Sequence, residues 1–346
     1  ICDVSGFFPV ARDALARPDL RSADSREFNV LDLPRHILNP GSALPIKGLF
    51  IYNHNPVAVH PRAGEMRAAL LSESVFVVGS DISMTDSMAC CDVILPAASH
   101  LEYGDLYKAY GHHYLQRTEA VIDPVGEAVS NMELFRRLAA RFDFGEPALH
   151  ESDEQLMDQA LSANSQGLGG RRPSQLLAGE AVDMRGQANA VIFRGQLPAT
   201  PSGKIELYSE ALQAQSGLGL PHFRALQARR AFVLISAASE QRINSTFGGI
   251  AGQSSDLFCE MHPDDASALS LPEGAQVRLY NDQGSVEVPL KFSERQCPGT
   301  VFVPKGAWLR ESPTGQTVNA LIPGHKADIA GGACYYDCSV DIVACA

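Results

Sequence analysis

The stretch between Lys47 and Glu102 alternates short apolar runs with helical or turn segments. Gly48–Tyr52, Val75–Val78 and Val93–Leu95 are apolar runs of strand length, and the segments between them have the composition of helices and loops. Strands that alternate with helices build parallel sheets whose faces the helices cover. The pattern therefore predicts an α/β region with a Rossmann-like parallel sheet and helices on both faces.

A polar loop follows each of these runs. The loops begin with Asn53, His54, Asn55 and Pro56 after the first run, with Gly79, Ser80 and Asp81 after the second, and with Pro96 after the third. In open α/β sheets, ligands bind beyond the carboxyl ends of the strands. The three loops are therefore expected to line one ligand-binding edge.

Beyond Ala231 the pattern becomes that of a β domain. The strand-like runs are Phe232–Ile235, Gln276–Tyr280, Ser285–Leu290 and Thr300–Val303, and turn-forming residues separate them. His262 to Ala266 starts a short helix, with a proline in its first turn. Several short strands at this spacing predict a barrel of about six strands.

Between these two regions the pattern is mostly helical and then irregular. Ser130 or Asn131 can cap a helix in which Leu134, Phe135, Leu138 and Phe142 recur at helical spacing. From about residue 146 the pattern loosens, as in segments that pack against another part of a protein. The sequence thus divides into an α/β region over 1–145, an irregular helical connecting segment over 146–230, and a barrel over 231–346.

Composition and charge exclude several classes of function. The net charge of -12 argues against a general nucleic-acid binder, because an acidic surface repels phosphate backbones. No apolar run approaches the roughly 18 to 20 residues of a membrane span, and no basic and then apolar leader opens the chain. We expect a cytoplasmic location, with any export signal in a preceding part of the protein.

The eight cysteines lack the paired spacing of zinc or iron-sulfur sites. They are Cys2, Cys90, Cys91, Cys259, Cys297, Cys334, Cys338 and Cys345. Buried free thiols explain this distribution best. Cys334, Cys338 and Cys345 lie close together in the sequence and could in principle bind a metal, but the alternation of a strand explains their spacing more simply.

A segment rich in tyrosine and histidine follows the α/β region, from Tyr103 to Pro124. One interpretation is a loop that lines a site, with His112 and His113 in reach of a substrate. The other is a surface turn whose rings pack on the sheet edge. Adjacent side chains diverge, so the histidine pair is not by itself a metal motif. His112 and His113 remain the weak candidates for catalytic residues, and no metal ligand is assigned.

The order of the motifs resembles the molybdopterin oxidoreductases of the dimethyl sulfoxide reductase superfamily, in their carboxyl-terminal half. The motifs are Gly48–Pro56, Val77–Asp81 with Thr85, Cys91–Pro96 followed by Glu102, Thr200–Glu206, Asn244–Thr246, His262–Ala266 and Val318–Leu321. The resemblance runs from about Leu33 to the end. It implies a double-psi type of barrel and, since Ile1 stands where an initiator methionine is expected, a chain that is a piece of something longer.

The resemblance also implies a cofactor and its contacts. This family holds molybdenum or tungsten through two molybdopterin guanine dinucleotides and carries out two-electron redox or oxygen-atom transfer. The residues that match its cofactor contacts are Asn55 or Asn53, Pro56, Ser80, Asp81, Thr85 and Asn131 in the α/β region, and Arg242, Asn244, Ser245, Thr246 and Asn319 in the barrel. Asp81 is suited to accept hydrogen bonds from a guanine edge.

The chain departs from the family in two places and lacks part of it. The loop Ala237–Thr246 lacks the Thr-Gly-Arg opening, which leaves Arg242 to supply a cation, and Tyr336 and Asp337 stand where many relatives carry a lysine. The amino-terminal half of the family, with its iron-sulfur region and metal-ligating residue, has no counterpart here. We therefore expect no turnover from the isolated chain and expect that half as a partner, with electron-transfer subunits as further partners.

Two other functions stay open at this point. A non-catalytic scaffold related to the large subunit of respiratory NADH dehydrogenase would share the α/β region, since fold alone does not establish chemistry. A nicotinamide-dependent dehydrogenase is disfavoured, because no GxGxxG turn follows a strand. The substrate, the choice between molybdenum and tungsten and the oligomeric state do not follow from the sequence.

Overall fold

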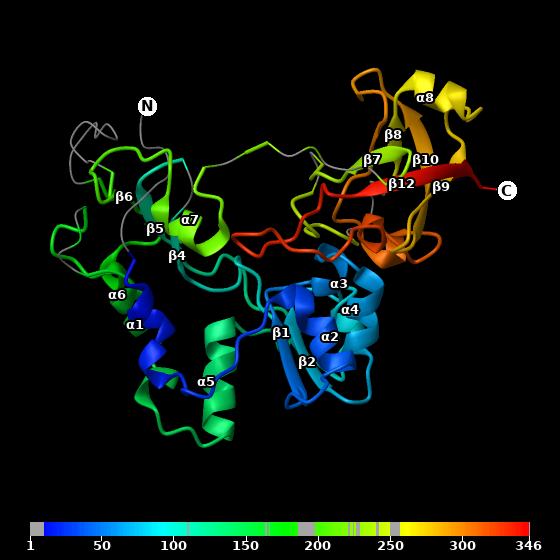
Figure 1. Cartoon of the computed structure of the whole chain (residues 1–346). Coiled ribbons are helices and arrows are strands. Elements are labelled where there is room, and N and C mark those ends of the chain that lie inside the picture. The colour runs from blue at the N-terminus through cyan, green and yellow to red at the C-terminus, as the bar shows by residue number, and fades with distance from the viewer. Residues whose placement is uncertain are drawn as a thin grey trace. The chain divides into compact units, whose positions relative to one another are not determined.

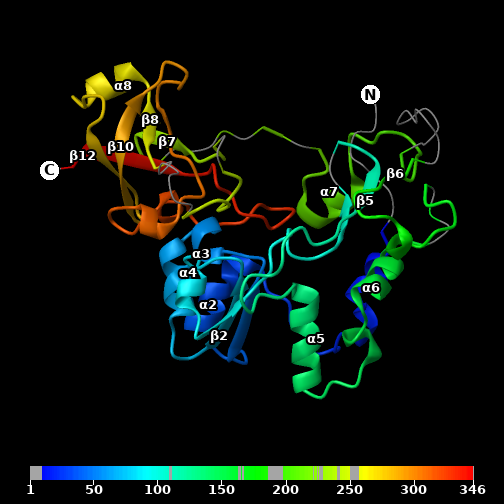
Figure 2. The same ribbon diagram turned by 180° about the vertical axis from the view of Figure 1, so that it is seen from behind.

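The computed structural model describes residues 10–108, 111–162, 165, 167–185, 198–220, 222–223, 225, 229–239, 242–249 and 257–345. The chain forms two compact units, one of residues 1–26 and 96–211 and the other of residues 27–95 and 212–346. We call the first the small-sheet unit and the second the sheet-and-barrel unit. Figures 1 and 2 show their elements from opposite sides. The sequence predicts three domains with boundaries at residues 145 and 230, and that division stays a prediction.

The sheet-and-barrel unit contains the predicted parallel sheet. Its strands are β1 (Gly48–Tyr52), β2 (Phe76–Asp81) and β3 (Val93–Pro96), in the order β1-β2-β3. β1 and β2 are parallel, and their register runs from Gly48 opposite Phe76 to Tyr52 opposite Ser80. All three strands lie where the apolar runs predicted them. The prediction of a parallel sheet is confirmed.

Short helices pack on this sheet and share a core with it. They are the 3₁₀ helices η2 (Val30–Asp32) and η3 (Met88–Cys90), and the α-helices α2 (Leu33–Leu38), α3 (Pro56–Val59) and α4 (Ala63–Leu70). Ile51, Val77 and Met88 are among the buried core residues. Gly79 has a direct packing role, because a Cβ at this position would overlap the Met88 and Cys91 sulfur atoms. Its small size lets η3 lie against β2.

The other part of this unit is a closed six-stranded barrel. Its strands are β7 (Phe232–Ile235), β8 (Cys259–Met261), β9 (Gln276–Tyr280), β10 (Ser285–Phe292), β11 (Thr300–Phe302) and β12 (Ser339–Ala344), closed in the order β10-β8-β11-β7-β12-β9. Parallel pairs, β10 with β8 and β11 with β7, occur beside antiparallel ones. The predicted fold class is confirmed, including the number of barrel strands.

Alternation along the strands fills the barrel interior. On β10, Val286, Val288 and Leu290 are each 1% exposed, while the residues between them face outward. The short elements that connect strands are α8 (Pro263–Ala268), η6 (Leu309–Glu311) and η7 (Val318–Ala320). One strand of the barrel, β8, was not predicted, because it is only three residues long. The strand expected around Cys334, Cys338 and Cys345 corresponds to β12, which lies between Cys338 and Cys345.

The small-sheet unit holds an antiparallel sheet, β4 (Leu106–Lys108), β5 (Tyr114–Arg117) and β6 (Ala181–Asp183). Its helices are α1 (Arg12–Ala16), η1 (Pro18–Leu20), α5 (Asn131–Arg141), η4 (Pro147–Leu149), α6 (Asp153–Ala160) and η5 (Pro173–Gln175); α7 (Glu210–Ser216) lies at the boundary between the units. The segment interpreted as a loop or surface turn, Tyr103–Pro124, contains β4 and β5. The absence of regular secondary structure in both interpretations was wrong, because β5 pairs with β4 and β6. The expectation that the segment lines a site stays a prediction.

Among the residues that the structure describes, helices are short or polar, and none has the length and apolarity needed to cross a bilayer.

Candidate functional site

The strand ends of β1 and β2 lie side by side, as the sequence predicts. Tyr52 pairs with Ser80, so the loops that start at Asn53 and Asp81 leave the sheet at the same edge. Asn53 takes a left-handed conformation with φ of 51°, which turns the chain sharply after β1. Ser80 is 1% exposed and lies on this edge. We call these two loops and the barrel residues that contact them the strand-end edge.

Asn55 joins three loops at the strand-end edge. Its Oδ1 atom accepts a hydrogen bond of 2.7 Å from the Ser87 hydroxyl and one of 3.3 Å from the Ser87 backbone N–H. Its Nδ2 atom donates to Ser245 Oγ of the barrel loop at 3.3 Å. The structure thus brings together two of the predicted contact residues, Asn55 and Ser245. It also gives Asn55 an internal role, because its amide is already hydrogen bonded.

Ser87 and Asp86 belong to the same network and were missed by the sequence reasoning. Ser87 is fully buried, and its Oγ accepts the Val57 backbone N–H at 3.0 Å. Asp86 accepts the Leu309 backbone N–H at 2.6 Å, and burial raises the pKa of this carboxyl. The available signal was a polar triplet, Thr85 to Ser87, in the loop that follows the second predicted strand.

Asp81, Thr85 and Pro56 lie at the same edge. Burial raises the pKa of Asp81, although its Oδ1 accepts the Ile82 N–H at 2.7 Å. Thr85 Oγ1 accepts the Met88 N–H at 3.2 Å and so supports η3. Pro56 starts α3, a helix of only four residues. Because proline has no N–H, this helix end offers little to an anion.

Arg242 is 2% exposed and is held by Glu311. Its Nη1 donates to Glu311 Oε2 at 2.7 Å and its Nη2 to Glu311 Oε1 at 3.2 Å, while Nη1 also reaches the Gly306 carbonyl at 3.3 Å. Burial opposes ionisation of Glu311, but hydrogen bonds from Arg242 and two backbone N–H groups win and lower its pKa. The charge of Arg242 is therefore already balanced within the barrel.

The loop from Asn244 to Thr246 is shaped by close backbone approaches. Asn244 has a φ of 53°, and a Cβ at Gly306 would overlap its carbonyl oxygen. Trp308 Nε1 donates to the Ser245 carbonyl at 2.9 Å, and Thr246 Oγ1 donates to the Ile243 carbonyl at 2.7 Å. These contacts hold the loop in one conformation beside the strand-end edge.

Several buried oxygens of this unit have no hydrogen-bond partner among the described residues. They are Ser80 Oγ, Ser236 Oγ, Thr317 Oγ1 and Asn319 Oδ1. Asn319 is 1% exposed, and its Nδ2 donates to the Ala58 carbonyl at 2.6 Å, so it links η7 to α3. Buried polar atoms are nearly always paired, and an exception marks a place where a ligand or water can bond. Ser80 and Asn319 were both predicted contacts.

Asn131, His112 and His113 belong to the small-sheet unit. Asn131 is the first residue of α5, which Ser130 caps by accepting the Glu133 N–H at 3.2 Å. His112 is exposed, and its Nδ1 accepts the Tyr114 N–H at 3.1 Å. In the same unit the carboxylate of Glu102, which is 8% exposed, accepts the Ser99 and Val125 N–H groups. The proposed roles of Asn131 and the two histidines stay predictions.

The fold and the strand-end edge define a class of protein: an α/β sheet whose ligand edge is joined by the loops of a closed barrel. Comparison with known families agrees with this class. Residues 29–141 match the family model described as molybdopterin oxidoreductase, and residues 232–339 match the one described as molydopterin dinucleotide binding domain. The chain belongs to the molybdopterin oxidoreductases of the dimethyl sulfoxide reductase superfamily.

Individual relatives agree. The chain is 35% identical to YoaE of Bacillus subtilis, described as a probable oxidoreductase, over 98% of this chain and 50% of that protein. It is 24% identical to the dimethyl sulfoxide/trimethylamine N-oxide reductase of Cereibacter sphaeroides, over 79% of this chain and 38% of that protein. The structure of acetylene hydratase from Pelobacter acetylenicus shares the fold, with a TM-score of 0.74 and 21% identity, over 92% of this chain and 46% of that one.

The chain spans about half the length of two curated relatives that it matches, both probable oxidoreductases of Bacillus subtilis. The residues that are present fit a molybdopterin cofactor in their hydrogen-bonding capacity. The unpartnered oxygens of Ser80, Ser236 and Asn319 are hydrogen-bonding groups that the protein leaves unused, and a pterin nucleotide is rich in N–H and O–H groups.

Proposed function

We propose that this chain is the carboxyl-terminal cofactor-binding part of a molybdenum or tungsten oxidoreductase that carries two molybdopterin guanine dinucleotides. The reaction class is two-electron redox or oxygen-atom transfer. The observation that carries the proposal is the coincidence of the two family matches with buried, unpartnered oxygens at Ser80 and Asn319. When bound, the cofactor would supply the redox-active metal.

The residues of the strand-end edge would hold one dinucleotide. Ser80 Oγ and Asn319 Oδ1 would accept hydrogen bonds from it, and Asp81 would accept the paired N–H groups of a guanine edge. Burial raises the pKa of Asp81, so the carboxylate gains from a partner that donates hydrogen bonds. Asn55 would position this edge, because it ties the β1 loop to Ser87 and Ser245.

The remainder of a longer protein would complete the site. Thiolates are the cysteine species that bind metals, and burial raises the pKa of Cys259 to about 12 and the pKa values of Cys91 and Cys338 to about 11. A metal would have to displace the proton of each of these thiols, and the sequence gives none of them the context of the family's metal ligand. We expect the metal ligand and any iron-sulfur cluster in the other half, and we expect no turnover from the 346-residue chain.

The test uses the longer protein, isolated and analysed for molybdenum, tungsten and oxidised pterin fluorescence. The proposal predicts a bound metal and pterin. Absence of both from a folded preparation would favour the alternative, a non-catalytic scaffold like the large subunit of respiratory NADH dehydrogenase. Reductase activity of the 346-residue chain with added cofactor would contradict the assignment of the metal ligand to the other half.

A matched pair of variants tests the strand-end edge itself. Ser80→Ala should lower the affinity for the pterin nucleotide by roughly threefold to tenfold, since a neutral hydrogen bond contributes about 1 kcal/mol. Ser74→Ala, at an exposed loop position, is the control and should leave the affinity unchanged. Equal affinity of both variants would remove Ser80 from the proposed site.

A further inference from the structure

We propose that His325, Cys334 and Asp337 form a binding site for a divalent transition-metal ion of the zinc type, a function beyond the proposed pterin site. One ligand atom from each residue lies within 4.8 Å of the other two. His325 Nε2 and Asp337 Oδ2 are 3.0 Å apart. In a tetrahedral zinc site with bonds of about 2.0–2.3 Å, neighbouring ligand atoms are about 3.5 Å apart. The separations in the cluster, none above 4.8 Å, are therefore close to that geometry.

The backbone holds these residues before any ion binds. His325 and Cys334 lie at the open end of a hairpin, in which Lys326 and Ala333 form an antiparallel bridge and the Cys334 N–H donates to the His325 carbonyl at 3.3 Å. The Ala327 N–H donates to the Gly332 carbonyl at 2.8 Å near its turn. A site whose ligands are already placed loses little conformational entropy on binding.

Two contacts with the segment before α2 fix the hairpin in the sheet-and-barrel unit. The Lys326 ammonium pairs with the Asp32 carboxylate at 2.5 Å, and Asn29 Nδ2 donates to the Gly331 carbonyl at 2.8 Å. The first contact also matters for the charge balance. Because Lys326 is engaged by Asp32, it does not neutralise the acids beside Cys334.

The local electrostatics favour a cation. The carboxylates of Asp337 and Asp328 act electrostatically on the Cys334 thiol. The same negative charges attract a metal ion, whose binding would release the thiol proton and form the thiolate that zinc prefers. His325 would bind through Nε2, so the present contact of Nε2 with Asp337 would be replaced by two bonds to the ion.

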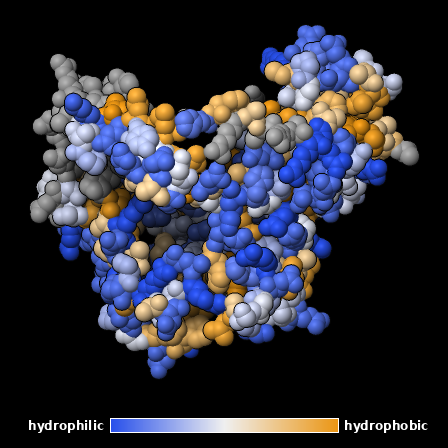
Figure 3. Space-filling model, viewed as in Figure 1, coloured by the Kyte–Doolittle hydropathy of each residue, from blue (hydrophilic) through white to orange (hydrophobic). Residues whose placement is uncertain are grey.

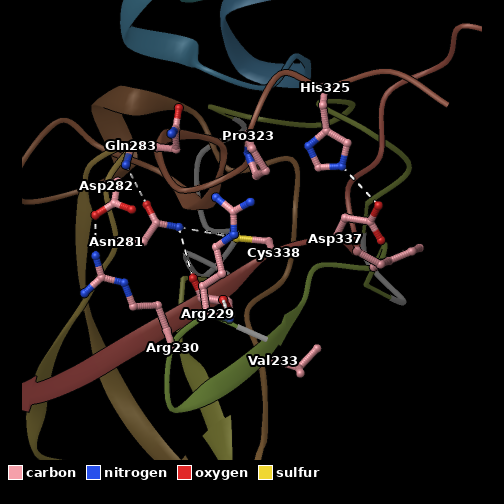
Figure 4. A pocket seen from close by; sticks show the side chains of 12 residues that line it. Arg229, Arg230, Val233, Asn281, Asp282, Gln283, Pro323, His325, Asp337 and Cys338 are labelled. Atoms are coloured by element: carbon pink, nitrogen blue, oxygen red, sulfur yellow. Dashed lines mark hydrogen bonds and ion pairs between the residues drawn. The ribbon is translucent and has the colours of Figure 1, made fainter. Parts of the chain in front are cut away.

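The site has three protein ligands and one open position. Figure 4 shows His325 directed toward Asp337, and both line a cavity of about 320 Å³ with Arg229 and Asn281. Cys338 lines the same cavity but is not a fourth ligand, because its Sγ is buried and donates to the Leu321 carbonyl at 3.3 Å. Three ligands with an open position are typical of zinc sites that bind water or an anion. Arg229, on the cavity wall, suits an anion there.

The test titrates the 346-residue chain with Co²⁺ and Zn²⁺ in the absence of pterin, so its result is independent of the proposed cofactor site. The expected result is one Co²⁺ bound per chain with a thiolate-to-cobalt charge-transfer band, which one equivalent of Zn²⁺ displaces. Cys334→Ala should abolish the band and weaken Zn²⁺ binding by at least about tenfold. Cys297→Ala, at an exposed cysteine outside the cluster, should change neither.

Asp337→Asn serves as the second variant and keeps the proposal testable if Cys334→Ala fails to fold. It should retain the charge-transfer band, because the thiolate remains, and still lower the affinity by about tenfold. Absence of a charge-transfer band in the unmodified chain, or an Asp337→Asn affinity equal to that of Cys297→Ala, would overturn the proposal.

Discussion

The barrel and the three-stranded sheet belong to the same compact unit but bury their apolar residues to different extents. In the barrel every strand has two neighbours, and Leu234, Met261 and Leu279 are fully buried. In the sheet, β1 and β3 have one neighbour each, and Phe76 and Val93 are 54% and 40% exposed. A closed sheet satisfies its own edges, whereas an open one leaves edges and faces for other chain segments.

This difference explains where the candidate site lies. The barrel provides rigid loops, and the open sheet provides strand ends that the loops can reach. Asn55 bonds to Ser245, and the Leu309 N–H bonds to Asp86, so each connection joins the sheet to the barrel. Figure 3 shows apolar residues at several places on the viewed face of the surface.

The largest expected effect comes from the buried ion pair of the barrel. The side chains of Arg242 and Glu311 are 1% and 15% exposed. Glu311→Ala would remove the carboxylate that pairs with the buried Arg242 charge, and we expect a loss of about 3–5 kcal/mol in the free energy of unfolding. Denaturant unfolding, followed by the fluorescence of Trp308, measures it, since this is the single tryptophan and is 3% exposed.

Glu273→Ala is the control, because Glu273 is an exposed barrel glutamate. The pair also predicts a pH dependence. The pKa of Glu311 is lowered in the folded state, so its contribution is present above the unfolded value of about 4.5 and is lost as the pH falls through the folded value. A Glu311→Ala protein as stable as the control would show that the pair contributes nothing.

The next largest loss of stability should come from a cavity made in the barrel core. Leu279 lies on β9 and is fully buried, so Leu279→Ala should cost about 2–5 kcal/mol. The same Trp308 transition measures it. A cost below about 1 kcal/mol would mean that the barrel is less well packed than its burial indicates.

These two regions also differ in how much the sequence predicted. Alternation along Phe232–Ile235 and Gln276–Tyr280 predicted β7 and β9 with their observed bounds, because each second residue points into a closed interior. The three residues of Cys259–Met261 are too few for a visible alternation, so β8 was missed. A strand of that length is specified by its neighbours, β10 and β11, which are distant in the sequence.

The site was predictable in position but not in detail. Parallel strand ends share an edge, which places Asn53 and Ser80 near each other without any tertiary information. The pairing of Arg242 with Glu311, 69 residues apart, depends on barrel closure. For the same reason no local pattern shows that Asn55 is hydrogen bonded to Ser87 and Ser245.

A pH effect of intermediate size should arise in the α/β part. His54 Nε2 and His60 Nε2 are 2.8 Å apart, so one ring donates and the other accepts. Burial lowers the pKa of both, and with repulsion from His54 it brings that of His60 to about 4. The unfolded chain then binds more protons between about pH 6.5 and pH 4, and stability should fall with decreasing pH by up to about 1.4 kcal/mol per pH unit for each histidine.

His60→Asn should flatten this dependence, whereas His100→Asn, at an exposed histidine of the small-sheet unit, should not. Unfolding curves at a series of pH values between 4 and 7 give the comparison. A profile that is identical in the two variants would assign the pH dependence to other groups.

The smallest expected effect tests the open sheet directly. Phe76 is 54% exposed at the start of β2, so Phe76→Ser should change the unfolding free energy of the 346-residue chain by less than about 0.5 kcal/mol. In the longer protein we propose that other segments cover this face, and there the same change should cost about 1.5–3 kcal/mol, the value of a buried phenylalanine side chain. The difference between the cost in the 346-residue chain and the cost in the longer protein tests whether this face is covered. A small cost in both proteins would show that Phe76 faces solvent throughout, and a large cost in both would show that the sheet is closed within this chain.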